Sequence, residues 1–92
     1  LTIDAPPLEL RIGAGGFAQV NSEQNRKLVA AVVAAAALSG QERVLDLYCG
    51  VGNFTLPLAR RAGSVVGVES YAPAIDEARA NAACHALGNA AF

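Results

Sequence analysis

A short apolar segment that runs into a glycine-containing turn limits the fold of this chain more than any other feature. Residues Arg43–Leu47 have the length of one strand, and a turn with two glycines follows within a few residues. We expect a helix over residues 53–61, with Pro57 in its first turn, where a missing backbone N–H costs least. The next segment, Ser64–Glu69, is apolar on both faces, which is typical of a buried parallel strand.

The segments on either side extend this alternation of strands and helices. Pro73 begins a further helix whose stop is expected at Gly88, and residues 90–92 begin a third strand. A helix is also expected over residues 22–40, before the first strand, because its valines and alanines fall at helical spacing. Strands that alternate with helices in this way predict an α/β fold with a Rossmann-like, doubly wound parallel sheet.

The amino-terminal residues show a different pattern. Residues 8–12 alternate between apolar and polar side chains, a glycine-rich break follows, and residues 17–20 are able to pair back as a second short strand. This pattern predicts a β-hairpin. We therefore divide the chain into a hairpin, residues 1–21, and the amino-terminal part of a Rossmann-like domain, residues 22–92.

Charge and composition exclude several classes of protein. The formal net charge is -1 and the basic residues are scattered, so no electrostatic surface for RNA or DNA is expected. Cys49 and Cys84 lack metal-ligand spacing, and no secretory signal is present, which predicts a cytoplasmic protein with free thiols and no metal site. The apolar run over residues 28–38 is too short to span a membrane. Because methionine is absent even from position 1, we expect a piece of a longer protein.

A glycine turn between a strand and a helix lets the backbone approach a ligand closely, and two ligand classes use it. Dinucleotides call for a third glycine and place their pyrophosphate at the helix N-terminus. Here Thr55 replaces that glycine, and Asp46 stands four residues before Gly50. At about 6 Å and a dielectric near 20, an ionised Asp46 and one charge of a pyrophosphate repel each other by roughly 3 kcal/mol. A helix N-terminus stabilises an anion by only ~0.3–2 kcal/mol. An ionised Asp46 beside Gly50 and Gly52 therefore favours the sulfonium and ammonium groups of S-adenosylmethionine.

The acid at the end of the second strand fits both ligand classes. A carboxylate at Glu69 is able to accept hydrogen bonds from both hydroxyl groups of a ribose. Both S-adenosylmethionine and NAD contain a ribose. The spacing alone therefore leaves an NAD(P)-binding oxidoreductase open as an alternative.

Three blocks of sequence carry a more specific resemblance: Phe17–Asn21, Val44–Ala59 and Val65–Glu69. In this order they resemble the RNA uracil-5-methyltransferase family, whose members modify ribosomal or transfer RNA. The resemblance implies a partial class I methyltransferase fold with S-adenosylmethionine as its cofactor. It also implies that four residues contact this cofactor: Gln19, Tyr48, Asn53 and Glu69. With Asp46, Gly50 and Gly52 from the glycine turn, they make up the predicted site.

Each of these side chains also has a simpler structural interpretation. Tyr48 suits an ordinary core position, Asn53 a helix N-cap and Gln19 a polar loop position. The resemblance favours function over these interpretations.

Three other positions are assigned no chemistry. Cys49 is interpreted as a small thiol that packs under the turn, and His85 as a surface histidine without a partner acid. The pair Arg60 and Arg61 is interpreted as a favourable charge arrangement at a helix C-terminus.

The resemblance also implies what this chain lacks. In the family a cysteine adds to C6 of uracil, which activates C5, and a base then removes the C5 proton. These groups belong to later parts of the family's sequence, so we assign no catalytic residue and expect no turnover by this chain alone. RNA is expected as the partner of the full-length enzyme only. A class I methyltransferase with another substrate and a non-enzymatic module remain as alternatives. We expect self-association through an exposed sheet edge.

Overall fold

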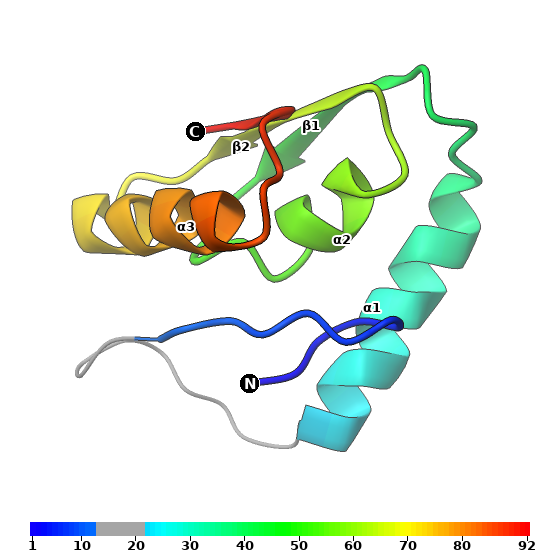
Figure 1. Ribbon diagram of the computed structural model, residues 1–92, viewed down its shortest axis with the longest axis horizontal. Helices are drawn as coiled ribbons and strands as arrows, with labels where there is room; N and C mark the ends of the chain where they lie inside the picture. Colours follow the sequence, from blue (N-terminus) through cyan, green and yellow to red (C-terminus); the bar gives the residue numbers. More distant parts are fainter. Residues whose placement is uncertain (13–21) are drawn as a thin grey trace.

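The computed structural model describes residues 1–12 and 22–92, and it shows the predicted alternation of helices and parallel strands (Figure 1). The three strands form one sheet in the order β1-β2-β3, and both pairings are parallel. The elements are α1 (Ser22–Ala36), β1 (Arg43–Leu47), α2 (Thr55–Ala59), β2 (Ser64–Val68), α3 (Ala72–Cys84) and β3 (Ala90–Ala91). The expected α/β class is therefore confirmed.

The strand register aligns the carboxyl ends of β1 and β2. Arg43 lies opposite Ser64 at one end of the pair, and Leu47 lies opposite Val68 at the other. The turn that follows β1 and the acid Glu69 that follows β2 therefore leave the sheet side by side. This is the edge at which ligands bind in open parallel sheets.

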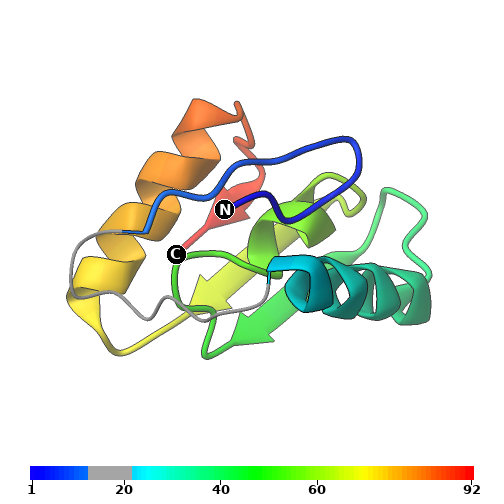
Figure 2. The same cartoon turned by 90° about the horizontal axis from the view of Figure 1, so that it is seen from below.

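Within the described residues, only one face of the sheet is covered. Helices α2 and α3 lie on this face, and the amino-terminal segment, residues 1–12, crosses these helices on the side away from the sheet (Figures 1 and 2). On the other face, Leu45, Leu47, Val66 and Val68 are all exposed. The expectation that β2 is buried on both faces is thus wrong for the described residues. Sequence alone does not distinguish a strand covered on two sides from one that is covered on one side.

Two groups of apolar side chains form the core. One joins the amino-terminal segment to the helices and consists of Ile3, Leu8, Leu10, Leu56 and Ala82. The other joins α2 to β2 and consists of Leu58, Ala59, Ala62 and Val65. Full burial of a large aliphatic side chain contributes about 1.5–3 kcal/mol, so the amino-terminal segment is an integral part of the packing.

The predicted β-hairpin is not seen. Its first arm pairs with residues that precede it: the Ile3 N–H donates to the Leu8 carbonyl at 3.0 Å, and Thr2 and Glu9 form an isolated antiparallel bridge. The prolines at positions 6 and 7 reverse the chain between these residues, which supplies a nearer partner than the one predicted. The second predicted arm, residues 17–20, lies outside the described residues.

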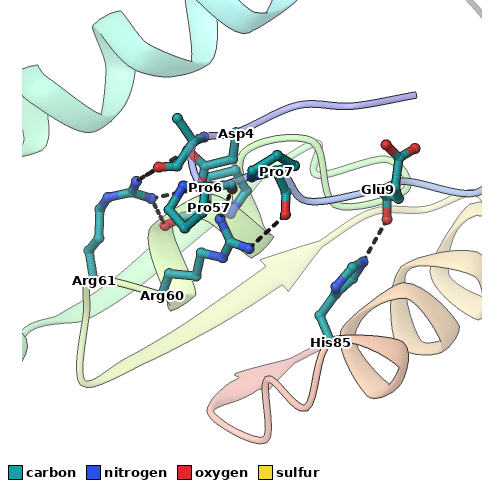
Figure 3. A network of polar contacts seen from close by, with 9 residues as sticks. Asp4, Pro6, Pro7, Glu9, Pro57, Arg60, Arg61 and His85 are labelled. Carbon is teal, nitrogen blue, oxygen red and sulfur yellow. Dashed lines mark hydrogen bonds and ion pairs between the residues drawn. The ribbon is translucent and has the colours of Figure 1, made fainter.

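The arginine pair on α2's carboxyl side holds the amino-terminal segment in place, which corrects its interpretation as a charge arrangement at the helix end alone (Figure 3). Arg60 Nη1 lies 3.1 Å from Asp4 Oδ2, and Arg61 Nη1 lies 2.9 Å from the same atom. Burial raises the pKa of Asp4, but the hydrogen bonds from Arg61 and from the Ala5 N–H, together with the charges of both guanidiniums, outweigh it and hold that pKa below its usual 3.8. Arg61 also donates to the Pro57 carbonyl one turn earlier, so the predicted helix-end contact exists as well.

Asn81 of α3 and His85, which caps the C-terminal end of this helix, attach the rest of the amino-terminal segment. The His85 ring bonds the Glu9 carbonyl at 2.8 Å, so this histidine has a structural partner (Figure 3). The buried Asn81 accepts from the Arg11 N–H at 2.9 Å and donates to the Arg11 carbonyl at 3.1 Å. Together with the arginine pair, these contacts fasten the segment along its length.

The two long helices end earlier than their glycines predict. Helix α1 stops at Ala36, and Ala37 takes the left-handed backbone conformation with φ 49°. Helix α3 stops at Cys84, and Ala86 takes that conformation with φ 55°. Glycine is favoured for such an end but is not required. No described helix has the length and hydropathy that a membrane crossing demands.

Candidate functional site

The connection between β1 and α2 is a tight turn that depends on its glycines. Gly50 and Gly52 have φ values of 56° and 101°, in the left-handed region that glycine adopts without steric cost. The Gly52 N–H donates to the Cys49 carbonyl at 3.0 Å, and the Cys49 N–H donates to the Val68 carbonyl at 3.0 Å. The turn is therefore closed on itself and bound to the end of β2. A Cβ at Gly50 would meet no atom within 4 Å, so its surroundings are open to a ligand.

Glu69 joins the turn to the start of α3. Its Oε1 accepts from the Gly50 N–H at 3.1 Å, and its Oε2 accepts from the Tyr71 N–H at 3.1 Å. The hydrogen bond from the Tyr71 N–H lowers the pKa of Glu69 most, and the bond from the Gly50 N–H adds to it, so this pKa lies below its usual 4.5. Hydrogen bonds from the backbone and the side chain of Ser70 lower this pKa further, so the carboxylate is ionised and is held between the turn and the start of α3.

Asp46 is held by a side chain that the sequence analysis used only as a missing glycine. Thr55, fully buried at the start of α2, donates its hydroxyl to Asp46 Oδ2 at 2.6 Å. This bond occupies one carboxylate oxygen and leaves the other without a protein donor among the described residues. The sequence did contain a signal for Thr55: it is a polar residue just after a glycine turn that an acid, Asp46, precedes.

Asn53 is not the helix N-cap. Phe54 holds that position without a side-chain cap bond, and the Asn53 carboxamide instead pairs with Asn25 of α1. Each amide donates to the other's oxygen at 2.8 Å. Sequence analysis missed Asn25, which is separated from the turn by 28 residues.

The aromatic side chains at this end of the sheet are exposed. Tyr48 is 89 % exposed, which excludes its interpretation as an ordinary core residue, and Tyr71 is 58 % exposed. Gln19, the remaining predicted contact, lies outside the described residues. The structure therefore brings Asp46, Tyr48, Gly50, Gly52, Asn53 and Glu69 to one end of the sheet and leaves the position of Gln19 open.

Cys49 is buried beneath the turn, as the sequence analysis expects. Burial, together with the charges of Asp46 and Glu69, raises the pKa of its thiol, which suppresses the reactive thiolate. A Cβ placed on Gly67 would lie 2.8 Å from Cys49 Sγ, so the glycine in β2 makes room for the sulfur. This cysteine therefore packs the turn and is poorly suited to nucleophilic chemistry.

The structure also has a hollow that lies away from the residues of this candidate site. An open hollow of about 570 Å³ lies between α3 and β3, where it is lined by residues such as Arg79, Leu87 and Phe92, and no predicted site residue lines it. Within residues 1–12 and 22–92, no three His, Cys, Asp or Glu side chains gather as they do around a metal ion.

Comparison with sequences of known proteins points to one family. The chain is 52 % identical over 82 residues to a 23S rRNA (uracil(1939)-C(5))-methyltransferase RlmD of Methylococcus capsulatus, which covers 89 % of this chain and 18 % of that protein. It is 44 % identical over 89 residues to the protein of the same name from Shewanella sp. strain ANA-3, covering 97 % and 20 %. The chain thus spans about a fifth of the length of these curated relatives.

Solved structures agree with the fold. A Pyrococcus abyssi tRNA (uracil-54, C5)-methyltransferase, crystallised in complex with S-adenosyl-L-homocysteine, matches with a TM-score of 0.70 and 35 % identity over 84 % of this chain and 19 % of that one. The precorrin 8W decarboxylase of Methanobacterium thermoautotrophicum matches with a TM-score of 0.74 over 88 % and 42 %, and at 23 % identity it supports the fold alone. The tRNA (Uracil-5-)-methyltransferase family matches residues 1–92. Because this match covers the whole sequence, the chain belongs to the tRNA (uracil-5-)-methyltransferase family.

Proposed function

We propose that this chain supplies part of the S-adenosylmethionine site of an RNA methyltransferase that methylates C5 of a uridine in 23S rRNA. The observation that carries the proposal is the bond from the Gly50 N–H to Glu69, which joins the glycine turn to the acid after β2. The family supports methyl transfer to uracil, and the named relatives support ribosomal RNA as the substrate. Residues 22–92 then form the amino-terminal part of the cofactor domain, and residues 1–21 lead into it.

Each predicted residue has a role in this proposal. Glu69 receives the ribose hydroxyls, and the turn at Gly50 and Gly52 lets the backbone approach the cofactor. Asp46 provides a negative charge for the sulfonium or ammonium group, and Asn53 binds the methionine end. Gln19 and the exposed Tyr48 complete the contacts, Tyr48 by packing against the cofactor.

The chemistry divides between this site and groups elsewhere. S-Adenosylmethionine bound at this site would supply the methyl group for C5 of uracil, and a base that we do not assign to this chain would take the C5 proton. We assign none of the proton or nucleophile chemistry to residues of this chain, because its one cysteine near the turn is buried with a raised pKa. The chain's share of the reaction is to bind and orient the methyl donor.

Calorimetric titration of the chain with S-adenosylhomocysteine and with NADH distinguishes the two ligand classes. We expect saturable binding of S-adenosylhomocysteine only, and we expect Glu69→Ala to weaken it. Glu23→Ala is the matched control, because Glu23 is an exposed acid on α1 whose ion pair with Lys27, at 4.0 Å, is its only one within the described part of the chain. Saturable binding of NADH with none of S-adenosylhomocysteine would favour the oxidoreductase.

A chimeric enzyme tests whether this segment supports methyl transfer. This chain would replace the matching segment of the Methylococcus capsulatus relative, to which it is 52 % identical. Transfer of a labelled methyl group is then measured on 23S rRNA and on tRNA transcripts. We expect transfer to 23S rRNA. A folded chimera that transfers no methyl group to 23S rRNA would contradict the proposed role of this segment.

Location and self-association follow as further parts of the proposal. Cys49 and Cys84 are free thiols, which supports the cytoplasm, where thiols stay reduced. Leu45 and Val66 are 62 % and 45 % exposed on the open face beside the edge strand β1, which supports self-association of the isolated chain there. Sedimentation velocity should show association that rises with concentration and that Leu45→Lys, on the edge strand β1, abolishes. A monomer at all concentrations would contradict this.

A further inference from the structure

The paired amides of Asn25 and Asn53 connect α1 to the glycine turn. Asn25 Nδ2 donates to Asn53 Oδ1, and Asn53 Nδ2 donates to Asn25 Oδ1, each at 2.8 Å. A pair of this kind holds both amide planes, because rotation of either one breaks two hydrogen bonds at once. The orientation of Asn53 is therefore set by a residue on another element.

The pair leaves half of the Asn53 amide available. A carboxamide has two N–H donors and two lone pairs on its oxygen. Pairing with Asn25 uses one donor and one lone pair. Within residues 1–12 and 22–92, one N–H and one lone pair of Asn53 therefore remain to bind a ligand, in a direction that Asn25 fixes.

The position of Asn25 on α1 shows that packing alone does not account for an amide there. Val29 and Val33 follow at intervals of four residues, which places all three side chains on one face of the helix. Val29 is 1 % exposed, and Val33 packs against the core group that contains Leu58 and Val65. An apolar side chain at position 25 would continue this face. The amide at position 25 instead lies where the helix passes the turn.

We propose that Asn25 is a positioning residue for the methyl donor: it does not touch the cofactor but holds the Asn53 carboxamide ready to bind the donor's methionine end. The inference rests on the proposed function, because it assigns the free half of Asn53 to that ligand. It predicts that losing Asn25 weakens only ligands that carry the methionine end, and only while Asn53 is present.

The test compares two ligands on the full chain by calorimetric titration. S-Adenosylhomocysteine carries the methionine end, whereas 5′-methylthioadenosine lacks its amino and carboxyl groups. For Asn25→Leu, a substitution with the same number and branching of side-chain heavy atoms that extends the apolar face of α1, we expect affinity for S-adenosylhomocysteine to fall about threefold to tenfold, the range of one neutral hydrogen bond. Affinity for 5′-methylthioadenosine should change by less than about twofold. Urea unfolding of each variant verifies that it is folded, and Asn25→Ala provides a second variant.

A double-mutant cycle with Asn53→Ala completes the experiment. If Asn25 acts through Asn53, Asn25→Leu should change the affinity for S-adenosylhomocysteine by less than about twofold once Asn53 is alanine. Equal weakening of both ligands, or independent effects of the two substitutions, would overturn the inference and leave the proposed function intact. If the unaltered chain binds neither ligand, the proposed function itself fails, and the inference fails with it.

Discussion

Replacement of Asp4 by alanine tests how the amino-terminal segment is held. The Asp4 side chain is 6 % exposed and accepts from both guanidiniums, at 3.1 Å from Arg60 and 2.9 Å from Arg61. Alanine removes the only carboxylate that the described structure places against these two cations. Their remaining partners are backbone carbonyls, including those of Ala5 and Pro7.

The size of the effect follows from the exposure of the three side chains. Breaking a fully buried ion pair costs about 3–5 kcal/mol, and an exposed pair contributes about 0–1 kcal/mol. Asp4 is almost buried, while Arg60 and Arg61 are 22 % and 29 % exposed, so solvent screens part of the interaction. We expect Asp4→Ala to lower the free energy of unfolding by about 2 kcal/mol. For a domain of this size, that corresponds to a fall in Tm of roughly 8–16 °C.

Urea and thermal unfolding of the chain, followed by far-UV circular dichroism at pH 7, measure this effect. Glu23→Ala is the matched control, because the Glu23–Lys27 pair has side chains 71 % and 68 % exposed and should change stability by less than about 0.5 kcal/mol. Since the pKa of Asp4 lies below 3.8, its stabilisation is present above that pH and is lost as the pH falls further. An effect of Asp4→Ala no larger than that of the control would refute the reasoning.

Three further substitutions test individual contacts near the sheet. Thr55→Val removes the hydroxyl that donates to Asp46 and should destabilise the chain by about 1–2 kcal/mol in urea unfolding. Gly67→Ala places a Cβ 2.8 Å from Cys49 Sγ and should cost about 1–3 kcal/mol in the same assay. The Ser39 hydroxyl and N–H lower the pKa of Glu42 to about 2, so Glu42 stabilises the fold above its unfolded value of 4.5 and this is lost as the pH falls toward 2. The difference in urea midpoint between the unaltered chain and Glu42→Gln should therefore narrow below pH 4.5.

Each of these predictions has a control and a contrary outcome. Thr2→Val also removes a hydroxyl that donates to a carboxylate, but at an exposed bond, and it should have little effect; equal losses for the two threonines would contradict the role of Thr55. A Cβ at Gly88 meets no atom within 4 Å, so Gly88→Ala should be tolerated, and Gly67→Ala should not. A difference in urea midpoint between the unaltered chain and Glu42→Gln that stays constant from pH 7 to pH 3 would contradict the lowered pKa of Glu42.

Local sequence patterns were sufficient to predict most of the secondary structure. The first strand lies at Arg43–Leu47 as expected, and Pro57 and Pro73 lie within the first turns of their helices. These features depend on residues that are adjacent or one turn apart. The helix ends were less predictable, because Ala37 and Ala86 adopt the conformation that glycine favours while the nearby glycines do not end the helices.

Contacts between distant segments could not be predicted. Asp4 is 56 residues from Arg60, and nothing in the sequence near the arginines indicates that an acid at the other end of the chain neutralises them. The same is true of Asn25 and Asn53, whose pairing depends on where α1 passes the turn. The glycine turn and Glu69 were predictable because the register of parallel strands places the two strand ends together.

The central claim is that the methyl donor binds at the glycine turn, and chemical-shift mapping tests it most directly. The chain, labelled with ¹⁵N, is titrated with S-adenosylhomocysteine and followed by two-dimensional NMR. We expect saturable shifts in the backbone N–H groups of Gly50, Gly52 and Asn53 and in the segment that follows β2 from Glu69 to Tyr71. Saturable shifts confined to the hollow between α3 and β3, around Arg79 and Leu87, would contradict the claim.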